Sequence, residues 1–261
     1  MNVFIHRTLN GNGVRSLIFK KANWTVPNIL TVLRIVAVPF FVWLLLQKDP
    51  TSRFIAFALF AAASITDLID GYLARKYRQE TELGKFLDPL ADKALVLGAF
   101  ITFLTMSAQV QIWMVLVIIG RDFLITSLRY LAIHKGRSLR TSVFGKIKTA
   151  FQMFCIVFII FSFLIVSYRE RGEINDIYAR GVEAGVSIAE VATANFYAFY
   201  NGTSGHGLAF DLASFLPYYL MLATTIMTII SGLRYLITNY RLLLPPYTAG
   251  AEAHSSGEGS N

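Results

Sequence analysis

The sequence predicts an all-α integral membrane protein with six transmembrane helices and an N-terminal interfacial segment. The first observation is composition: 55% of the residues are hydrophobic and only 15% are charged, whereas soluble domains usually carry about 25% charged residues. The second is the mean hydropathy of +0.53. The third is a set of six apolar runs, most of which approach the roughly 20 residues that a helix needs to cross a bilayer. These runs are 29–46, 54–69, 94–106, 112–125, 150–166 and 215–237.

The basic residues indicate an orientation for these helices. They gather at 7–21, 76–85 and 135–148, which lie on one side of the membrane if the N-terminus is cytoplasmic. The positive-inside rule then places both termini and these loops in the cytoplasm. The formal charge of +8 therefore reflects topology and attraction to anionic lipid headgroups, and we expect no nucleic-acid partner.

The chain divides into three regions along its length. Residues 1–23 mix apolar and basic side chains, which is typical of an interfacial segment on the cytoplasmic face. Residues 24–244 form the predicted membrane domain, with 168–214 as an extracytoplasmic insertion whose apolar residues recur at helical spacing. Residues 245–261 are rich in Pro, Gly, Ser and Ala and are expected to be a disordered cytoplasmic tail. Cys155 lies inside the fifth apolar run and is expected to behave as a small hydrophobic residue.

The strongest chemical signal is a group of four aspartates at the junction of the second and third spans. Asp67 and Asp70 end the second span, and Asp88 and Asp92 begin the third. A carboxylate within a membrane helix costs about 2.5–3.5 kcal/mol on insertion scales, so such residues are functional candidates. The spacings of three and four place each pair on one helical face. We expect the two pairs to face each other near the cytoplasmic boundary.

The aspartates point to a divalent metal site. Four crowded carboxylates repel one another unless some are protonated or cations balance them. Oxygen ligands without cysteine or a nearby histidine favour Mg²⁺ or Mn²⁺, and two such ions suit phosphoryl chemistry. The alternatives are structural salt bridges with Arg75, Lys85 and Lys93, or an ion pathway through the bilayer. Clustering in one leaflet favours the metal site over a pathway.

The same residues carry a family resemblance. Asp67-Leu-Ile-Asp70-Gly71-Tyr-Leu-Ala74-Arg75, followed after eight residues by Gly84-Lys-Phe-Leu-Asp88-Pro-Leu-Ala-Asp92, resembles the full signature of the CDP-alcohol phosphotransferase family. The resemblance implies that family's six-helix fold, usually dimeric, with a two-metal site open to the cytoplasm. It also implies roles for individual residues. Metal ligands would be Asp67, Asp70, Asp88 and Asp92, with Asp92 also the general base, and contacts to the CDP group would come from Gly71, Ala74, Arg75 and Gly84. To these we add Asn28 and Thr31, polar residues at the cytoplasmic start of the first span, as contacts to the diphosphate of CDP-diacylglycerol.

A second cationic site is expected for the acceptor alcohol. Arg121 and Arg129 are eight residues apart in the fourth span, and Lys146 and Lys148 open the fifth. An arginine within a membrane helix has a free-energy cost similar to that of a carboxylate, and binding of a phosphorylated acceptor would offset it. The alternative is partial snorkelling, with Arg121 paired to Asp122 or to the four aspartates of the predicted metal site.

Three further segments, 26–34, 120–129 and 145–152, resemble the members of this family that use glycerol 3-phosphate. The resemblance implies transfer of the phosphatidyl group of CDP-diacylglycerol to glycerol 3-phosphate, with release of CMP and formation of phosphatidylglycerol phosphate at the inner membrane. Inositol phosphate and phosphatidylglycerol remain alternative acceptors. A cation transporter is the alternative from a different functional class.

Overall fold

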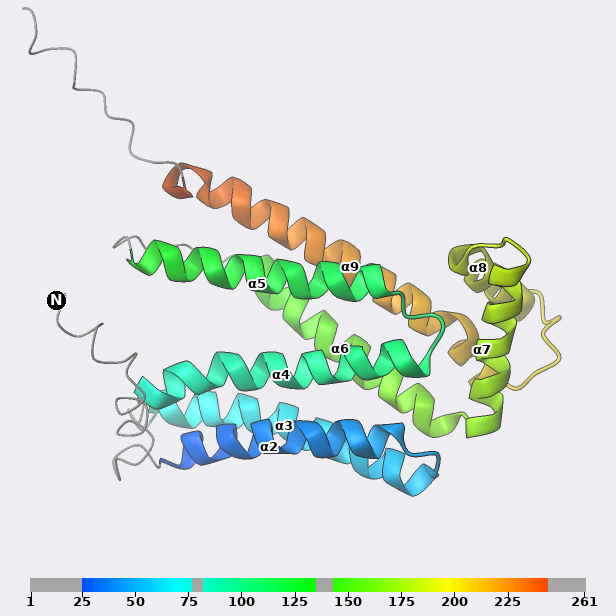
Figure 1. Cartoon of the computed structure of the whole chain (residues 1–261), viewed down its shortest axis with the longest axis horizontal. Helices are drawn as coiled ribbons and strands as arrows, with labels where there is room; N and C mark the ends of the chain where they lie inside the picture. The colour runs from blue at the N-terminus through cyan, green and yellow to red at the C-terminus, as the bar shows by residue number, and fades with distance from the viewer. Residues whose placement is uncertain (1–24, 77–81, 135–142, 244–261) are drawn as a thin grey trace, which may run out of the picture.

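The computed structural model describes residues 25–76, 82–134 and 143–243, and all regular structure in these ranges is α-helical. Long helices form a bundle, and two shorter helices lie across one end of it (Figure 1). The long helices are α2 (Val26–Leu46), α3 (Pro50–Lys76), α4 (Glu82–Met106), α5 (Ile112–His134), α6 (Val143–Ile165) and α9 (Leu208–Leu243). The shorter helices are α7 (Tyr168–Glu183) and α8 (Ile188–Tyr200). The predicted interfacial segment and tail lie outside the described residues.

Several of the long helices have the length and surface of membrane helices. Each apolar run lies in a different long helix, apart from Val166, which follows the last residue of α6. Among the described residues, Asn28–Leu46, Ile147–Ile165 and Leu208–Tyr240 are long and apolar enough to cross a bilayer, and α3 and α4 carry shorter apolar segments. Large apolar side chains also point outward from the bundle. An exposed apolar surface of this kind is stable in lipid rather than in water. The chain is therefore a membrane protein with several apolar helices.

The long helices form two groups. Helix α2 packs on α3 and α4, whereas α9 packs on α5 and α6, and α6 also contacts α3 (Figure 1). Gly98 allows α4 to approach α2 closely, because a Cβ atom there would lie 3.1 Å from Val38 Cγ1. Phe103 of α4 packs edge-on against Phe163 of α6, with ring centroids 5.7 Å apart. Cys155 is buried in the α6–α9 contact beside Met221, as its apolar surroundings predict.

The predicted insertion forms a helical hairpin, α7–α8, instead of one helix. Gly185 breaks the helical run because its φ is +81°, a left-handed conformation that glycine adopts without strain. Ser167 and Ser187 begin the two helices, each in a reciprocal capping box with Glu170 or Glu190. The serine hydrogen bonds hold the pKa of each glutamate below its ordinary value.

The hairpin is attached to the long helices by polar groups. Asn175 of α7 donates to the carbonyl oxygen of Met106 at 3.1 Å and accepts from the backbone N–H of Ala108 at 3.0 Å, at the turn between α4 and α5. Arg171 is buried with its guanidinium 5.0 Å from the centre of the Phe163 ring. Burial, and secondarily the charge of Arg53, lowers the pKa of Arg171 to about 10. The hairpin therefore contacts both helix groups, and we call this end of the bundle the hairpin end.

Pro217 creates the main attachment point of the hairpin on α9. Proline has no N–H, so it cannot donate to the carbonyl oxygen four residues earlier, which belongs to Ala213. The Nε2 of Gln109 replaces this donor at 2.8 Å and also reaches the carbonyl oxygen of Ser214 at 3.0 Å. Tyr178 of α7 and Asn195 of α8 donate to the same Ser214 oxygen at 2.6 and 3.2 Å. The α4–α5 turn, α7 and α8 thus each donate a hydrogen bond to the carbonyl oxygen of Ser214 in α9.

We predict that Gln109→Leu lowers the stability of the protein by about 1–3 kcal/mol, the usual cost of leaving a buried polar group without its partner. Thermal unfolding in detergent measures the loss. Pro217→Ala is the matched control, because alanine at position 217 restores the N–H that can donate to the carbonyl oxygen of Ala213. In the Pro217→Ala background, Gln109→Leu should cost clearly less. Equal costs in the two backgrounds would show that Gln109 does not compensate for the proline.

Candidate functional site

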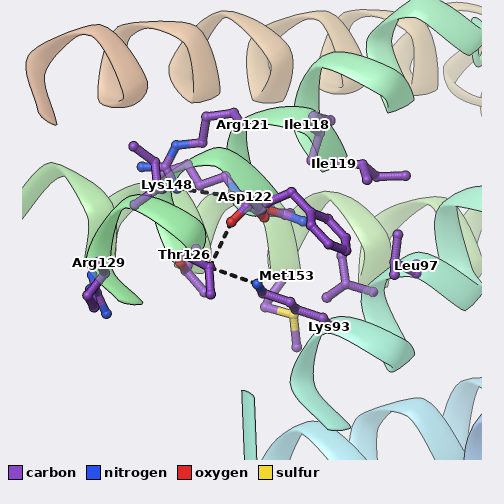
Figure 2. Close-up of a pocket in the computed structure, with 15 residues that line it drawn as sticks. Lys93, Leu97, Ile118, Ile119, Arg121, Asp122, Thr126, Arg129, Lys148 and Met153 are labelled. Carbon is purple, nitrogen blue, oxygen red and sulfur yellow. Dashed lines mark hydrogen bonds and ion pairs between the residues drawn. The ribbon is translucent and has the colours of Figure 1, made fainter. Parts of the chain in front are cut away.

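A pocket of about 530 Å³ lies between the two helix groups, away from the hairpin end. Helix α4 contributes one wall through Lys93, Val96 and Leu97, and α5 and α6 contribute the others (Figure 2). The volume lies within the range of small-molecule sites. The lining residues from α5 and α6 are Ile118, Ile119, Arg121, Asp122, Phe123, Ile125, Thr126, Arg129, Lys148, Thr149, Gln152 and Met153. The pocket thus combines an apolar wall with several cations, and we call its end of the bundle the pocket end.

Asp122 organises the charges of the pocket. Its Oδ1 accepts from Arg121 Nη1 at 3.0 Å. Both of its carboxylate oxygens accept from Lys148 Nζ, at 2.9 and 2.8 Å. The Lys148 side chain is only 3% exposed, so its charge depends on nearby anions for compensation. One carboxylate therefore joins α5 to α6 and neutralises part of the charge of two cations.

Helix α9 supports Arg121 from behind. Ser231 Oγ accepts from Arg121 Nη2 at 2.8 Å. At the next position, a Cβ on Gly232 would lie 3.1 Å from Arg121 Cγ, so the absence of a side chain makes room for the arginine stem. Arg121 is held between two partners, in a fixed orientation.

Lys93 approaches Asp122 from the α4 wall of the pocket, on the side opposite Arg121 (Figure 2). Its Nζ donates to Thr126 Oγ1 at 2.7 Å, and Thr126 in turn donates to the backbone oxygen of Asp122 at 2.7 Å. The Lys93 ammonium also lies 5.4 Å from the centre of the Phe123 ring. No described residue supplies a carboxylate to Lys93 or to Arg129, which is exposed at the pocket. These two cations differ in this respect from Arg121 and Lys148.

The structure brings together three of the four residues predicted to bind the acceptor. Arg121, Arg129 and Lys148 all line the pocket, and the alternative pairing of Arg121 with Asp122 is also present. The side chain of Lys146 lies outside the described residues. Asn28 and Thr31 are buried at the start of α2.

The predicted metal and nucleotide residues are placed by the backbone alone. Asp67, Asp70, Gly71, Ala74 and Arg75 lie in α3, and Gly84, Asp88 and Asp92 lie in α4. Their side chains are outside the described part of the structure. Among the side chains that are described, no three histidine, cysteine, aspartate or glutamate residues gather into a possible metal site.

Lys93 and Thr126 are pocket residues that the sequence reasoning missed. Lys93 was considered only as a structural partner of the aspartates, although it directly follows Asp92. Thr126 lies one helical turn after Asp122 and three residues before Arg129. Periodicity along the fourth span could have placed Thr126 on the face of those two residues.

Comparisons with known proteins identify an enzyme family to which this chain is similar. The model of the CDP-alcohol phosphatidyltransferase family matches residues 24–194. A protein of Rickettsia bellii named CDP-diacylglycerol–glycerol-3-phosphate 3-phosphatidyltransferase is 42% identical over 137 residues, which cover 52% of this chain and 75% of that protein.

Two further relatives carry the same name. The Cereibacter sphaeroides protein is 37% identical over 171 residues, covering 62% of this chain and 76% of its own length. The Bacillus subtilis protein is 37% identical over 145 residues, covering 51% and 75% respectively.

We predict that Asp122→Asn destabilises the protein by about 1–3 kcal/mol, less than for a fully buried pair because Asp122 is partly exposed. The physical cause is the loss of the negative charge beside Lys148 and Arg121. Thermal unfolding of Asp122→Asn, Lys148→Met and the double variant measures the coupling. The double variant should lose less stability than the two single losses together, and Asp122→Glu should lose least. Strictly additive losses would contradict the pairing.

Proposed function

The chain belongs to the CDP-alcohol phosphatidyltransferase family, and from this membership and the pocket we propose that it transfers the phosphatidyl group of CDP-diacylglycerol to glycerol 3-phosphate. The products are phosphatidylglycerol phosphate and CMP, in phospholipid biosynthesis. The relatives named for this reaction, at 36–42% identity, support the assignment.

The charge of the pocket is the structural observation that best supports a phosphorylated acceptor. Four cationic side chains and one carboxylate line it, a formal excess of three positive charges among the described residues. A phosphate monoester carries close to two negative charges at neutral pH. A neutral alcohol would leave this excess unbalanced in a partly apolar cavity, where charge burial is costly.

The acceptor phosphate binds Lys93 and Arg129 first in this proposal. Arg121 and Lys148 already share Asp122, so the phosphate must compete with a carboxylate for them. Lys93 has a neutral hydroxyl and an aromatic face as its described partners. Lys146 is proposed to add a further cation from the start of α6.

The reacting hydroxyl is then placed near α4. Asp92 directly precedes Lys93, and it lies one helical turn from the pocket residue Val96. We assign Asp92 as the general base that takes the proton from the primary hydroxyl of glycerol 3-phosphate. The hydroxyl oxygen forms a bond to the phosphorus that carries diacylglycerol, and the bond from that phosphorus to the CMP oxygen breaks.

The nucleotide side of the reaction is assigned to α2, α3 and α4. Asn28, Thr31, Gly71, Ala74, Arg75 and Gly84 are proposed to hold the CDP group. Asp67, Asp70, Asp88 and Asp92 would hold two Mg²⁺ or Mn²⁺ ions, because their carboxylates are the hard oxygen ligands that these cations prefer. Bound ions would neutralise negative charge on the diphosphate.

The wider arrangement of the protein is part of the same proposal. Residues 24–244 form the membrane domain with six crossings, and 168–214 lie on the extracytoplasmic side. The pocket end faces the cytoplasm of the cell, in the inner membrane, as the clustered basic residues suggest. A homodimer is proposed from the family resemblance.

Release of CMP from CDP-diacylglycerol by the purified protein tests the reaction. With Mg²⁺ or Mn²⁺, we expect release only when glycerol 3-phosphate is present, and none from the Asp92→Asn variant, which should still bind CDP-diacylglycerol. Release with inositol phosphate or phosphatidylglycerol instead would keep the chemistry and overturn the acceptor. No release from folded protein, together with metal flux in liposomes, would support the transporter alternative.

We predict that Lys93→Met raises the KM for glycerol 3-phosphate by about 10- to 100-fold, as expected for the loss of a hydrogen bond to a charged group worth about 1.5–3 kcal/mol. Arg129→Met should act in the same direction, and the KM for CDP-diacylglycerol should change little in both. Lys48→Met is the matched control, because Lys48 is exposed at the hairpin end, beside Tyr168. Unchanged KM with a reduced kcat in Lys93→Met would mean that Lys93 acts on the reacting groups and not on the acceptor.

A further inference from the structure

Helix α8 has an unusual surface for a helix outside the long bundle. Its only charged residue is Glu190, in the first turn, and its second half is aromatic. Tyr200 is 75% exposed, Tyr197 is 56% exposed and Phe196 is 38% exposed. Helix α7, in contrast, exposes five charged side chains. These are Arg169, Glu173, Asp176, Arg180 and Glu183. The two helices of the hairpin therefore present surfaces suited to different surroundings.

The contacts of α8 fix its depth along the bundle. Asn195 donates to the carbonyl oxygen of Ser214, and the hydroxyl groups of Thr193 and Tyr219 are 3.1 Å apart. Phe196 packs edge-on against Phe215, with ring centroids 5.4 Å apart. Helix α8 therefore lies beside residues 214–219 of α9.

The length of α9 relates residues 214–219 to the edge of the hydrocarbon layer. From residue 218 to Tyr240, α9 extends about 35 Å at ~1.5 Å per residue. That length already exceeds the ~30 Å thickness of the hydrocarbon layer. With Tyr240 taken at the opposite boundary of the candidate span Leu208–Tyr240, residues 214–217 and the attached α8 fall at the lipid–water boundary of the hairpin end.

Two exposed tryptophans lie at the ends of other helices on the same side of the bundle. Trp43 lies in the last turn of α2 and is 60% exposed, and Trp113 is the second residue of α5 and is 43% exposed. Both are at the hairpin end. Exposed tryptophan and tyrosine at one level are typical of the aromatic belts that sit among lipid headgroups.

We propose that α8 is an interfacial helix whose aromatic face, formed by Phe196, Tyr197 and Tyr200, docks on the lipid headgroup region at the hairpin end. Helix α7 faces water. The occupant of this face is the bilayer that already surrounds the long helices, because the exposed aromatic surface is continuous in depth with their lipid-facing ends. The inference is independent of the reaction proposed above.

Site-specific fluorescence in lipid nanodiscs tests the proposal. An environment-sensitive fluorophore is attached to Tyr200→Cys and, as the matched control on the other helix, to Glu173→Cys. Cys155 is the only native cysteine and is completely buried, so the unsubstituted protein measures background labelling. Quenchers are lipids with a nitroxide at the headgroup and aqueous iodide. We expect headgroup nitroxide to quench the label at position 200 several-fold more than the label at 173, with the reverse order for iodide.

Two results would overturn the proposal. Equal quenching of both labels by iodide, without quenching by nitroxide lipid, would place α8 in water. Protection of position 200 from both quenchers would indicate a protein contact, such as a second copy of the chain. Tyr197→Ser with Tyr200→Ser provides a second measurement, since it should lower the unfolding temperature in nanodiscs more than in detergent. An equal effect in the two environments would also contradict docking on lipid.

Discussion

The pairing of Asp122 with Arg121 and Lys148 is the interaction on which the pocket depends. A membrane bundle can hold cations at this depth only if anions or polar groups accompany them. Asp122 of α5 pairs with Lys148 of α6 and with Arg121. Arg121 in turn donates a hydrogen bond to Ser231 of α9. Three helices are thereby held in register by one carboxylate. Lys93 of α4 and Arg129 of α5, the other two described cations of the pocket, do not take part in this pairing.

The arrangement of the two helix groups places α4 beside both sets of residues proposed to bind the substrates. Helix α4 packs on α2, yet its residues Lys93, Val96 and Leu97 form a wall of the pocket between the groups. The predicted base Asp92 is the neighbour of Lys93 in sequence. The nucleotide residues proposed on α3 and α4 and the acceptor cations on α5 and α6 are therefore brought to a common helix. Apolar side chains around the cations lower the local dielectric constant, which would strengthen their interaction with a phosphate.

Much of the fold could be predicted from the sequence because lipid imposes a simple rule on composition. The apolar runs located the long helices, and the clustered arginines of the fourth span correctly indicated residues that share a face. The division of the insertion into two helices was missed, because the signal is local: a left-handed glycine and a serine cap within a run whose apolar spacing continues. The position of Lys93 was also missed. A lysine beside four aspartates has an obvious electrostatic explanation, and only the packing of α4 against α5 shows that its ammonium reaches Thr126.

The missing N–H of Pro217 has a consequence for the order in which the molecule is assembled. The acceptor groups that hold Gln109, Tyr178 and Asn195 belong to the backbone of α9, which is the last of the described helices along the chain. During synthesis, the earlier segments emerge before their partner exists. The polar side chains of Gln109, Tyr178 and Asn195 must therefore remain hydrated until α9 has entered the membrane. Closure of this junction is a late event in biogenesis, and a chain truncated before α9 would lack the backbone acceptors that hold the hairpin and the α4–α5 turn.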